Sequence, residues 1–172
     1  MTALRIANKP ELLARTLTML SETVERYDLF ADQMEVVNNP QAAEIFRWLE
    51  QKQRERTQVV QDLSEGLALP HIPPWDYHWD DAINIEVPGH ASAHYMMTPY
   101  HTLTLAIDVE QGAADLFDNI ERDTELPEVR KLAHGFAREA NAFCDYLKQK
   151  REQYPLPQAG WDEDEDPPQF LE

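Results

Sequence analysis

Residues 28–40, DLFADQMEVVNNP, and residues 115–127, DLFDNIERDTELP, are two copies of one pattern, and they decide the fold of this chain. A shift of 87 residues places one DLF tripeptide on the other and Pro40 on Pro127. A matching tripeptide alone is a weak signal. The proline ten residues after each phenylalanine, however, marks the same turn in both halves, and the helical spacing on both sides also matches. The chain is therefore predicted to contain a duplicated helical hairpin.

Apolar residues recur at spacings of three and four on both sides of the first turn, which is typical of amphipathic helices. Asn8 and Pro10 indicate a helix over 10–37, and Gly66 ends a second helix that starts at Pro40. The short connection predicts that the two helices lie antiparallel. Their apolar positions are Leu13, Leu17, Leu20, Val24, Tyr27, Ala31 and Met34 in the first helix, and Ala42, Ile45, Phe46, Leu49, Val60 and Leu63 in the second.

The second half repeats this arrangement after a long interruption. Residues 67–98 break every periodicity and hold four prolines, so we expect them to form a crossover. Thr98 and Pro99 then start a third helix, with apolar positions at Leu103, Ala106, Ile107, Ala113, Phe117 and Ile120. A fourth helix starts at Pro127 and ends by Pro155, with apolar positions at Val129, Leu132, Ala133, Phe136 and Leu147.

These elements predict one all-α domain with a tail. The domain covers residues 1–154 and contains a hairpin at 10–66, the crossover and a hairpin at 99–152, which together form a four-helix bundle. Residues 155–172 contain an acidic run followed by two prolines, Pro167 and Pro168, and they are too charged to fold alone. We expect this acidic C-terminal tail to be solvated, with docking to a basic partner protein as the alternative.

Composition excludes several classes of function. The net charge is −17, with 15 Lys and Arg against 32 Asp and Glu, so nucleic acids and anionic membranes are not expected partners. The single cysteine, Cys144, cannot form an internal disulfide, and the start of the chain lacks the apolar run of a signal peptide. No apolar stretch is long enough to span a membrane. A cytoplasmic protein is therefore expected.

The stretch YMMTPYHTLTLAIDVEQGAADLF, residues 95–117, carries a resemblance to a known family. It resembles the third helix of rubrerythrin-like proteins, a branch of the ferritin-like superfamily, in which a ligand glutamate is followed seven residues later by an aromatic residue. Glu110 and Phe117 fit that spacing. The resemblance covers about residues 10–150 and implies a ferritin-like bundle made of two hairpins joined by a crossover.

The same resemblance implies a di-iron site in the middle of the bundle. In the family each hairpin supplies one Glu from its first helix, and then a Glu and a His three residues apart from its second. Carboxylates neutralise and bridge two cations, and imidazole completes their coordination. Transferred position by position, the pattern leaves only Glu110 as a ligand. The six positions of this vestigial layer hold Thr23, Gln53, Arg56, Glu110, Ala140 and Phe143.

An ion pair is expected in place of the metals. The inward phase of the second and third helices selects Gln53, Arg56 and Glu110, and a buried carboxylate without a partner is costly. We therefore predict that Arg56 pairs with Glu110 in two-pronged fashion, with Thr23 and Gln53 satisfying the remaining donors and acceptors. In the alternative, Arg56 extends outward between helices and Glu110 meets water.

Two other metal sites stay open as alternatives. Glu22 with Glu55, or Glu110 with Glu139, offers carboxylates one position from the family pattern. His90 and His94 share a face if their segment is helical, a spacing that suits zinc, nickel or copper, with Asp80, Asp81 or Glu86 as a third ligand. The competing interpretation is that the crossover histidines are surface or packing residues.

Ligand loss favours a non-catalytic protein over an enzyme. We expect no cofactor and no catalytic residue, and therefore a structural or interaction module that keeps the bundle. Cys144 is expected to be a packed residue, and Trp48, Trp75 and Trp79 either fill the core or form an interface patch. A homodimer or higher homo-oligomer is expected. The alternative is an iron- or zinc-binding member that acts in iron handling or in peroxide or oxygen chemistry.

Overall fold

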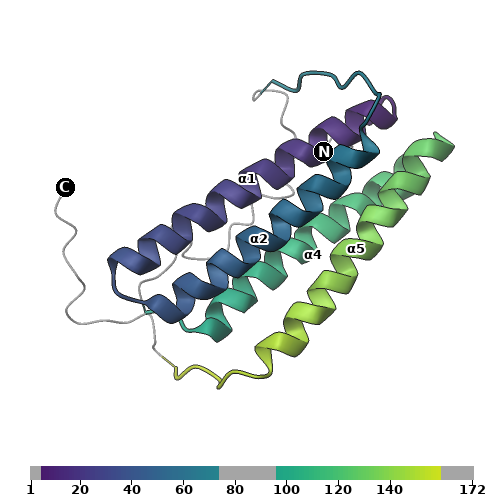
Figure 1. The fold of residues 1–172 in the computed structure, drawn as a ribbon. Helices are drawn as coiled ribbons and strands as arrows, with labels where there is room; N and C mark the ends of the chain where they lie inside the picture. Colours follow the sequence, from purple (N-terminus) through teal and green to yellow (C-terminus); the bar gives the residue numbers. More distant parts are fainter. Residues whose placement is uncertain (1–4, 74–95, 160–172) are drawn as a thin grey trace.

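The computed structural model describes residues 5–73 and 96–159, and it consists of four α-helices with no strand in those ranges. The helices are α1 (Lys9–Val36), α2 (Pro40–Leu63), α4 (Pro99–Asp123) and α5 (Pro127–Arg151). They lie side by side with their long axes nearly aligned (Figure 1). The expected all-α four-helix bundle is confirmed.

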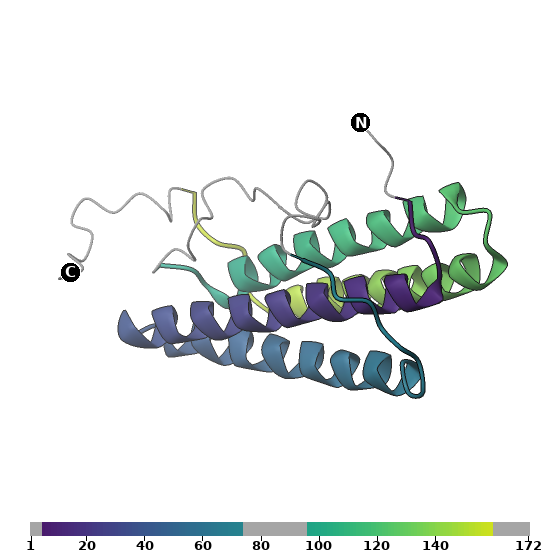
Figure 2. The same cartoon turned by 90° about the horizontal axis from the view of Figure 1, so that it is seen from above.

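The bundle is made of two antiparallel hairpins. α1 packs along α2 and α4 packs along α5, with α2 against α4 and α1 against α5 between the hairpins (Figure 2). The shift of 87 residues found in the sequence relates their boundaries as well. It takes Val36, the end of α1, to Asp123, the end of α4, and it takes the first residue of α2 to the first residue of α5.

Local sequence explains where each helix begins. Asn8 caps α1 by accepting a hydrogen bond of 2.9 Å from the Glu11 amide. Thr98 caps α4, and the His101 side chain accepts a hydrogen bond of 3.1 Å from the Thr98 amide, which completes a capping box. All four helices have a proline in the first turn, where its missing N–H costs nothing. The predicted starts at Pro40, Pro99 and Pro127 are correct.

The turns between helices use residues that tolerate unusual backbone angles. Asn38 has a φ of 59° in the α1–α2 turn, and Gly66 has a φ of 78° just after α2. From there the chain runs back across the start of α1, where Leu69 and Ile72 pack on the core. The remainder of the expected crossover, from residue 74 to residue 95, lies outside the described residues.

The core consists of two hydrophobic clusters, one at each end of the bundle. The first, near the α1–α2 turn, is built around Tyr27, Phe30, Phe46, Leu49, Leu103 and Leu147. The second, near the α4–α5 turn, is built around Leu12, Leu13, Leu20, Val60, Phe117 and Phe136. Most apolar positions taken from the helical spacing are buried. Leu63 is an exception at 44% exposed, because α2 ends there and no helix covers it.

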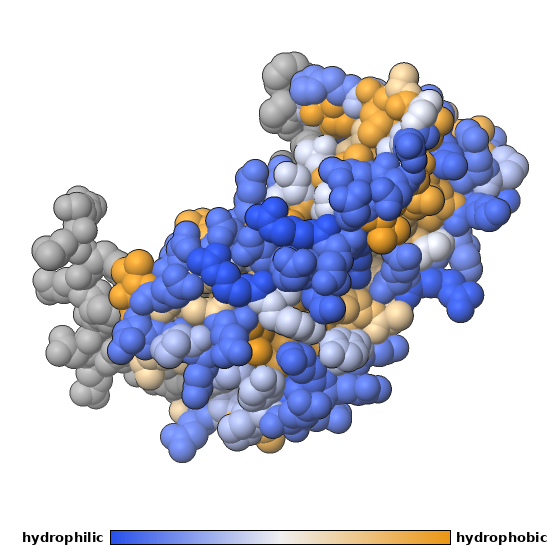
Figure 3. Space-filling view, viewed as in Figure 1, coloured by the Kyte–Doolittle hydropathy of each residue, from blue (hydrophilic) through white to orange (hydrophobic). Residues whose placement is uncertain are grey.

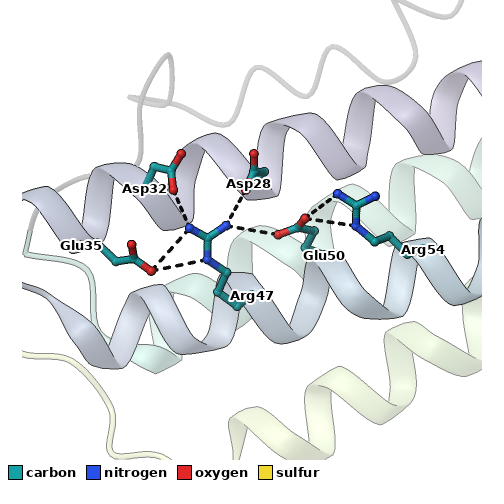
Figure 4. A network of polar contacts seen from close by, with 6 residues as sticks. All are labelled: Asp28, Asp32, Glu35, Arg47, Glu50 and Arg54. Atoms are coloured by element: carbon teal, nitrogen blue, oxygen red, sulfur yellow. Dashed lines mark hydrogen bonds and ion pairs between the residues drawn. The ribbon is translucent and has the colours of Figure 1, made fainter.

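One arginine fastens the first hairpin on its outer side. Arg47 of α2 forms ion pairs with Asp28, Asp32 and Glu35 of α1, and with Glu50 of its own helix (Figure 4). The Arg47 side chain is 37% exposed, so solvent screens these ion pairs. The network therefore fixes the pairing of α1 with α2 more than it adds stability.

One face of the bundle is seen in the space-filling view of Figure 3. In the face shown in Figure 3, hydrophilic residues predominate and hydrophobic ones gather in smaller patches. Among the described residues no helix is both long and apolar enough to cross a membrane.

Candidate functional site

A polar layer lies between the two hydrophobic clusters, at the positions where the family resemblance places the di-iron ligands. On every helix the position concerned falls between residues of one cluster and residues of the other. On α4, for example, Val109 belongs to the first cluster and Ala113 to the second, with Glu110 between them. The layer holds Thr23 from α1, Gln53 and Arg56 from α2, Glu110 from α4, and Ala140 and Phe143 from α5.

Glu110 is the centre of this layer. It is 2% exposed, and each of its carboxylate oxygens accepts a hydrogen bond from α2. The Gln53 amide nitrogen donates to Oε1 at 2.7 Å, and Arg56 Nη1 donates to Oε2 at 2.9 Å. Burial strengthens both bonds, since water competes little for the carboxylate. The network therefore joins the first hairpin to the second through the middle of the bundle.

Arg56 reaches this carboxylate from the edge of the bundle. Its side chain is 20% exposed, and its guanidinium also lies 5.3 Å from the ring centre of Phe143 on α5. Phe143 in turn stacks on Tyr146 and contacts Trp48, at ring-centre distances of 6.3 and 6.2 Å. Arg56 thus contacts one member, Phe143, of an aromatic group that also contains Trp48 and Tyr146.

Tyr27 adds a second polar group close to the layer. Its side chain is fully buried, and its hydroxyl has no hydrogen-bond partner among the described residues. Burial raises the pKa of Tyr27 well above its ordinary value, and the negative charge of Glu110 raises it further. The phenol is therefore held neutral.

The predicted Arg56–Glu110 ion pair is present, but two of its expected details are wrong. Arg56 donates a single bond to Glu110 instead of two, because Gln53 already occupies the other carboxylate oxygen. Thr23 donates its hydroxyl proton to the Met19 carbonyl of its own helix at 2.9 Å, as helical threonines often do. The alternative in which Arg56 extends outward and Glu110 meets water is excluded.

The carboxylates offered as shifted ligands are all exposed. Glu22, Glu55 and Glu139 lie on the outer faces of their helices, and Glu55 forms an ion pair of 3.4 Å with Lys52. Across the described ranges 5–73 and 96–159, no three His, Cys, Asp or Glu side chains come together closely enough to hold a metal ion. His90 and His94 lie outside the described residues, and so do Asp80, Asp81 and Glu86.

Comparison with known proteins gives one informative match. No family model matches the chain, and neither does any curated protein. A crystal structure of COG1633, an uncharacterized conserved protein from Magnetospirillum magnetotacticum MS-1, superposes with a TM-score of 0.67. The two sequences are 30% identical, and the match covers 88% of this chain and 98% of the other. The chain belongs to the COG1633 family.

The four-helix bundle of the chain is therefore ferritin-like. The comparison supports the fold and the family of the chain. It assigns no activity, because the related protein is itself described as uncharacterized. Whatever the chain does must therefore be argued from its own residues.

The residues of the polar layer in this COG1633 protein do not fit a di-iron centre. Ala140 and Phe143 have no atom that can coordinate a metal, and the Arg56 cation lies 2.9 Å from the one carboxylate that the pattern retains. An iron ion at Glu110 would compete with the hydrogen bonds to the carboxylate oxygens and would be repelled by the guanidinium.

Sequence reasoning missed two features of this layer. The helical spacing identifies Tyr27 only as an apolar position, although Tyr27 follows Thr23 by four residues and so lies on the same face of the helix as Thr23. The aromatic group was also missed, although Phe143 and Tyr146 stand three residues apart on one helix. Trp48 is partly buried and packs against the first cluster, whereas Trp75 and Trp79 lie outside the described residues.

Burial raises the pKa of the Cys144 thiol, so the thiol stays protonated at neutral pH.

Proposed function

We propose that this chain is a rubrerythrin-like protein with a degenerate di-iron site, and that it acts as a non-catalytic structural or interaction module. The observation that carries the proposal is the Gln53–Glu110–Arg56 network. It satisfies both oxygens of the remaining carboxylate with donors from the protein itself. The network supports a structural role, because it joins α2 to α4 at the level where metals would otherwise tie the hairpins together.

Metal analysis combined with a ferrous oxidation assay tests this proposal. The full chain, purified without chelator and then incubated anaerobically with ferrous iron, is expected to keep no iron after desalting. It is also expected to oxidise ferrous iron no faster than buffer does. Bound iron would raise the melting temperature by mass action, so an unchanged melting temperature is a second expected result. Two irons per chain with rapid oxidation would overturn the proposal.

The matched control is Glu110→Gln, which removes only the carboxylate. If the proposal holds, wild type and this variant have the same metal content and oxidation rate. Iron that is bound by the wild type and lost in Glu110→Gln would instead assign the chain to the metal-binding alternative. Retention of Gln53 leaves a hydrogen-bond partner for the new amide, so the variant is expected to fold.

We also propose that the module works as a homodimer or higher homo-oligomer in the cytoplasm. Apolar side chains remain exposed along the bundle, among them Leu29 at 54% and Val59 at 48%. Sedimentation equilibrium of the full chain at micromolar concentration is expected to give a mass above 20.0 kDa. A monomer at every concentration would contradict the proposal.

A further inference from the structure

A groove opens at the end of the bundle where α2 and α4 begin and α5 ends. Its volume is about 560 Å³, and the first residues of both helices line it together with the end of α5. Three aromatic side chains, Trp48, Tyr100 and Tyr154, form its walls. None of its lining residues belongs to the Glu110 network.

Cationic side chains border the aromatic walls. Lys150 Nζ lies 4.5 Å from the centre of the Trp48 ring. The Arg151 guanidinium lies 5.0 Å from the ring centre of Tyr100. Such cation–π contacts hold the charges at the groove without neutralising them. An anionic group can therefore still pair with them.

The basic residues at the end of α5 form no close ion pair among the described residues, although Arg151 interacts electrostatically with Asp108. The last turn contains Lys148, Lys150 and Arg151, and among the described residues no carboxylate lies within 4.0 Å of their charged atoms. Arg47, Arg54 and Arg56 on α2 are all ion-paired. The helix dipole favours cations at this end, but it does not explain why a chain of net charge −17 leaves them without close ion pairs among the described residues.

The chain leaves the fold at this groove and then becomes acidic. Pro155 lines the groove, and the described residues end at Ala159. Residues 160–172, GWDEDEDPPQFLE, contain six acidic residues and no Lys or Arg. Asp162 follows Pro155 by seven residues, so at about 3.3 Å per residue the acidic run can reach roughly 20 Å from the groove.

We propose that segment 160–172 docks in this groove of its own chain. The acidic run 162–166 pairs with Lys150 and its basic neighbours, and Trp161 packs on the aromatic walls. Glu44 of α2 also lines the groove and repels the acidic run, so the run is expected on the α5 side, next to Lys150. A short tether gives an effective concentration on the order of millimolar, so weak contacts suffice for docking. The inference goes beyond the proposed function and is independent of the iron result.

Paramagnetic relaxation in the full chain tests this docking. A nitroxide is attached at Gln169→Cys, and relaxation enhancement is measured at the Trp48 indole N–H and the Lys150 amide. The native thiol, Cys144, is buried and is not expected to react. Strong enhancement at both positions is expected. In labelled Lys150→Glu it should fall roughly fivefold or more, since the charge reversal turns an attraction into a repulsion.

Lys131→Glu is the matched control, because it makes the same charge change at an exposed position near the start of α5. It should leave the enhancement unchanged. Neutralising residues 162–166 with Asn and Gln, or adding salt to the wild type, should reduce it as Lys150→Glu does. Equal enhancement in Lys150→Glu and Lys131→Glu would overturn the proposal. So would enhancement that appears only between labelled and unlabelled copies, since that result assigns the groove to a second chain.

Discussion

At the scale of a single residue, Glu110 is a buried carboxylate whose negative charge is compensated by one cation, Arg56. Its side chain is 3% exposed, and the Arg56 side chain that pairs with it is 20% exposed. Removing one member of a buried pair leaves the other charge without compensation, which costs far more than an exposed ion pair is worth. The two positions are therefore expected to be energetically coupled.

Arg56→Met tests this coupling. Methionine keeps apolar contact with Phe143 but removes the charge, so we expect a loss of about 2–3 kcal/mol in the free energy of unfolding. The double variant with Glu110→Gln should recover about 1–2 kcal/mol of that loss, because no buried charge remains. Urea unfolding measures both. Arg54→Met is the control; the Arg54 side chain is 57% exposed, so loss of its ion pair with Glu50 should cost less than about 1 kcal/mol.

Tyr27 makes a different prediction, because its hydroxyl is buried and lacks a partner among the described residues. Tyr27→Phe should stabilise the protein at pH 7 by up to about 1 kcal/mol, since it removes an unsatisfied polar group. Tyr146→Phe changes an exposed hydroxyl and should have no effect. A destabilised Tyr27→Phe would indicate that the hydroxyl has a partner.

The raised pKa of Tyr27 also predicts how the free energy of unfolding changes with pH. The folded state keeps the phenol proton, whereas the unfolded chain loses it above the ordinary pKa of 10.0, so this contribution to stability disappears as pH rises above 10. Between pH 10 and pH 11 the wild type should lose about 1 kcal/mol relative to Tyr27→Phe. Urea unfolding at the two pH values measures the difference.

At the scale of the helices, the Asn39 side chain connects the two hairpins. Its side-chain oxygen caps α2 by accepting from the Ala42 amide at 3.2 Å. Its amide nitrogen donates to the Met97 carbonyl, just before α4, at 2.7 Å. One side chain thus sets the start of a helix in the first hairpin and positions the chain that enters the second.

Asn39→Ala should therefore cost more than the loss of a cap alone. We expect a loss of about 2–3 kcal/mol in the free energy of unfolding, from the cap and the long-range hydrogen bond together. Asn8→Ala is the matched control, because Asn8 caps α1, and it should cost about 1 kcal/mol. Thermal unfolding of both variants measures the difference, and equal losses would show that the bond to Met97 contributes nothing.

The whole molecule carries a strong excess of negative charge. A net charge of −17 over 172 residues opposes the compact state through self-repulsion. Salt screens this repulsion, so raising the ionic strength from about 0.01 M to about 0.5 M at pH 7 should raise the melting temperature. Calorimetry at both salt concentrations measures the shift. Near pH 4.6, where the net charge approaches zero, the shift should vanish.

The sequence by itself determined the architecture of this protein. Periodicity, turn prolines and the 87-residue duplication are local signals, and they located all four helices within the described residues. The absence of metal-binding atoms in the side chains of Ala140 and Phe143 also follows directly from residue identity. The pairing of Arg56 with Glu110 could also be predicted from the sequence, since the helical phase places both residues on inward faces of their helices.

Only the tertiary structure decided how the polar layer is satisfied. Gln53 and Glu110 are 57 residues apart, and the helical phase does not predict that Gln53, instead of a second nitrogen of Arg56, binds the other carboxylate oxygen. The groove likewise joins residues of α2, α4 and α5 that no periodicity relates. Helical spacing fixes which face a residue occupies, but the packing of one hairpin against the other fixes which atoms on those faces meet.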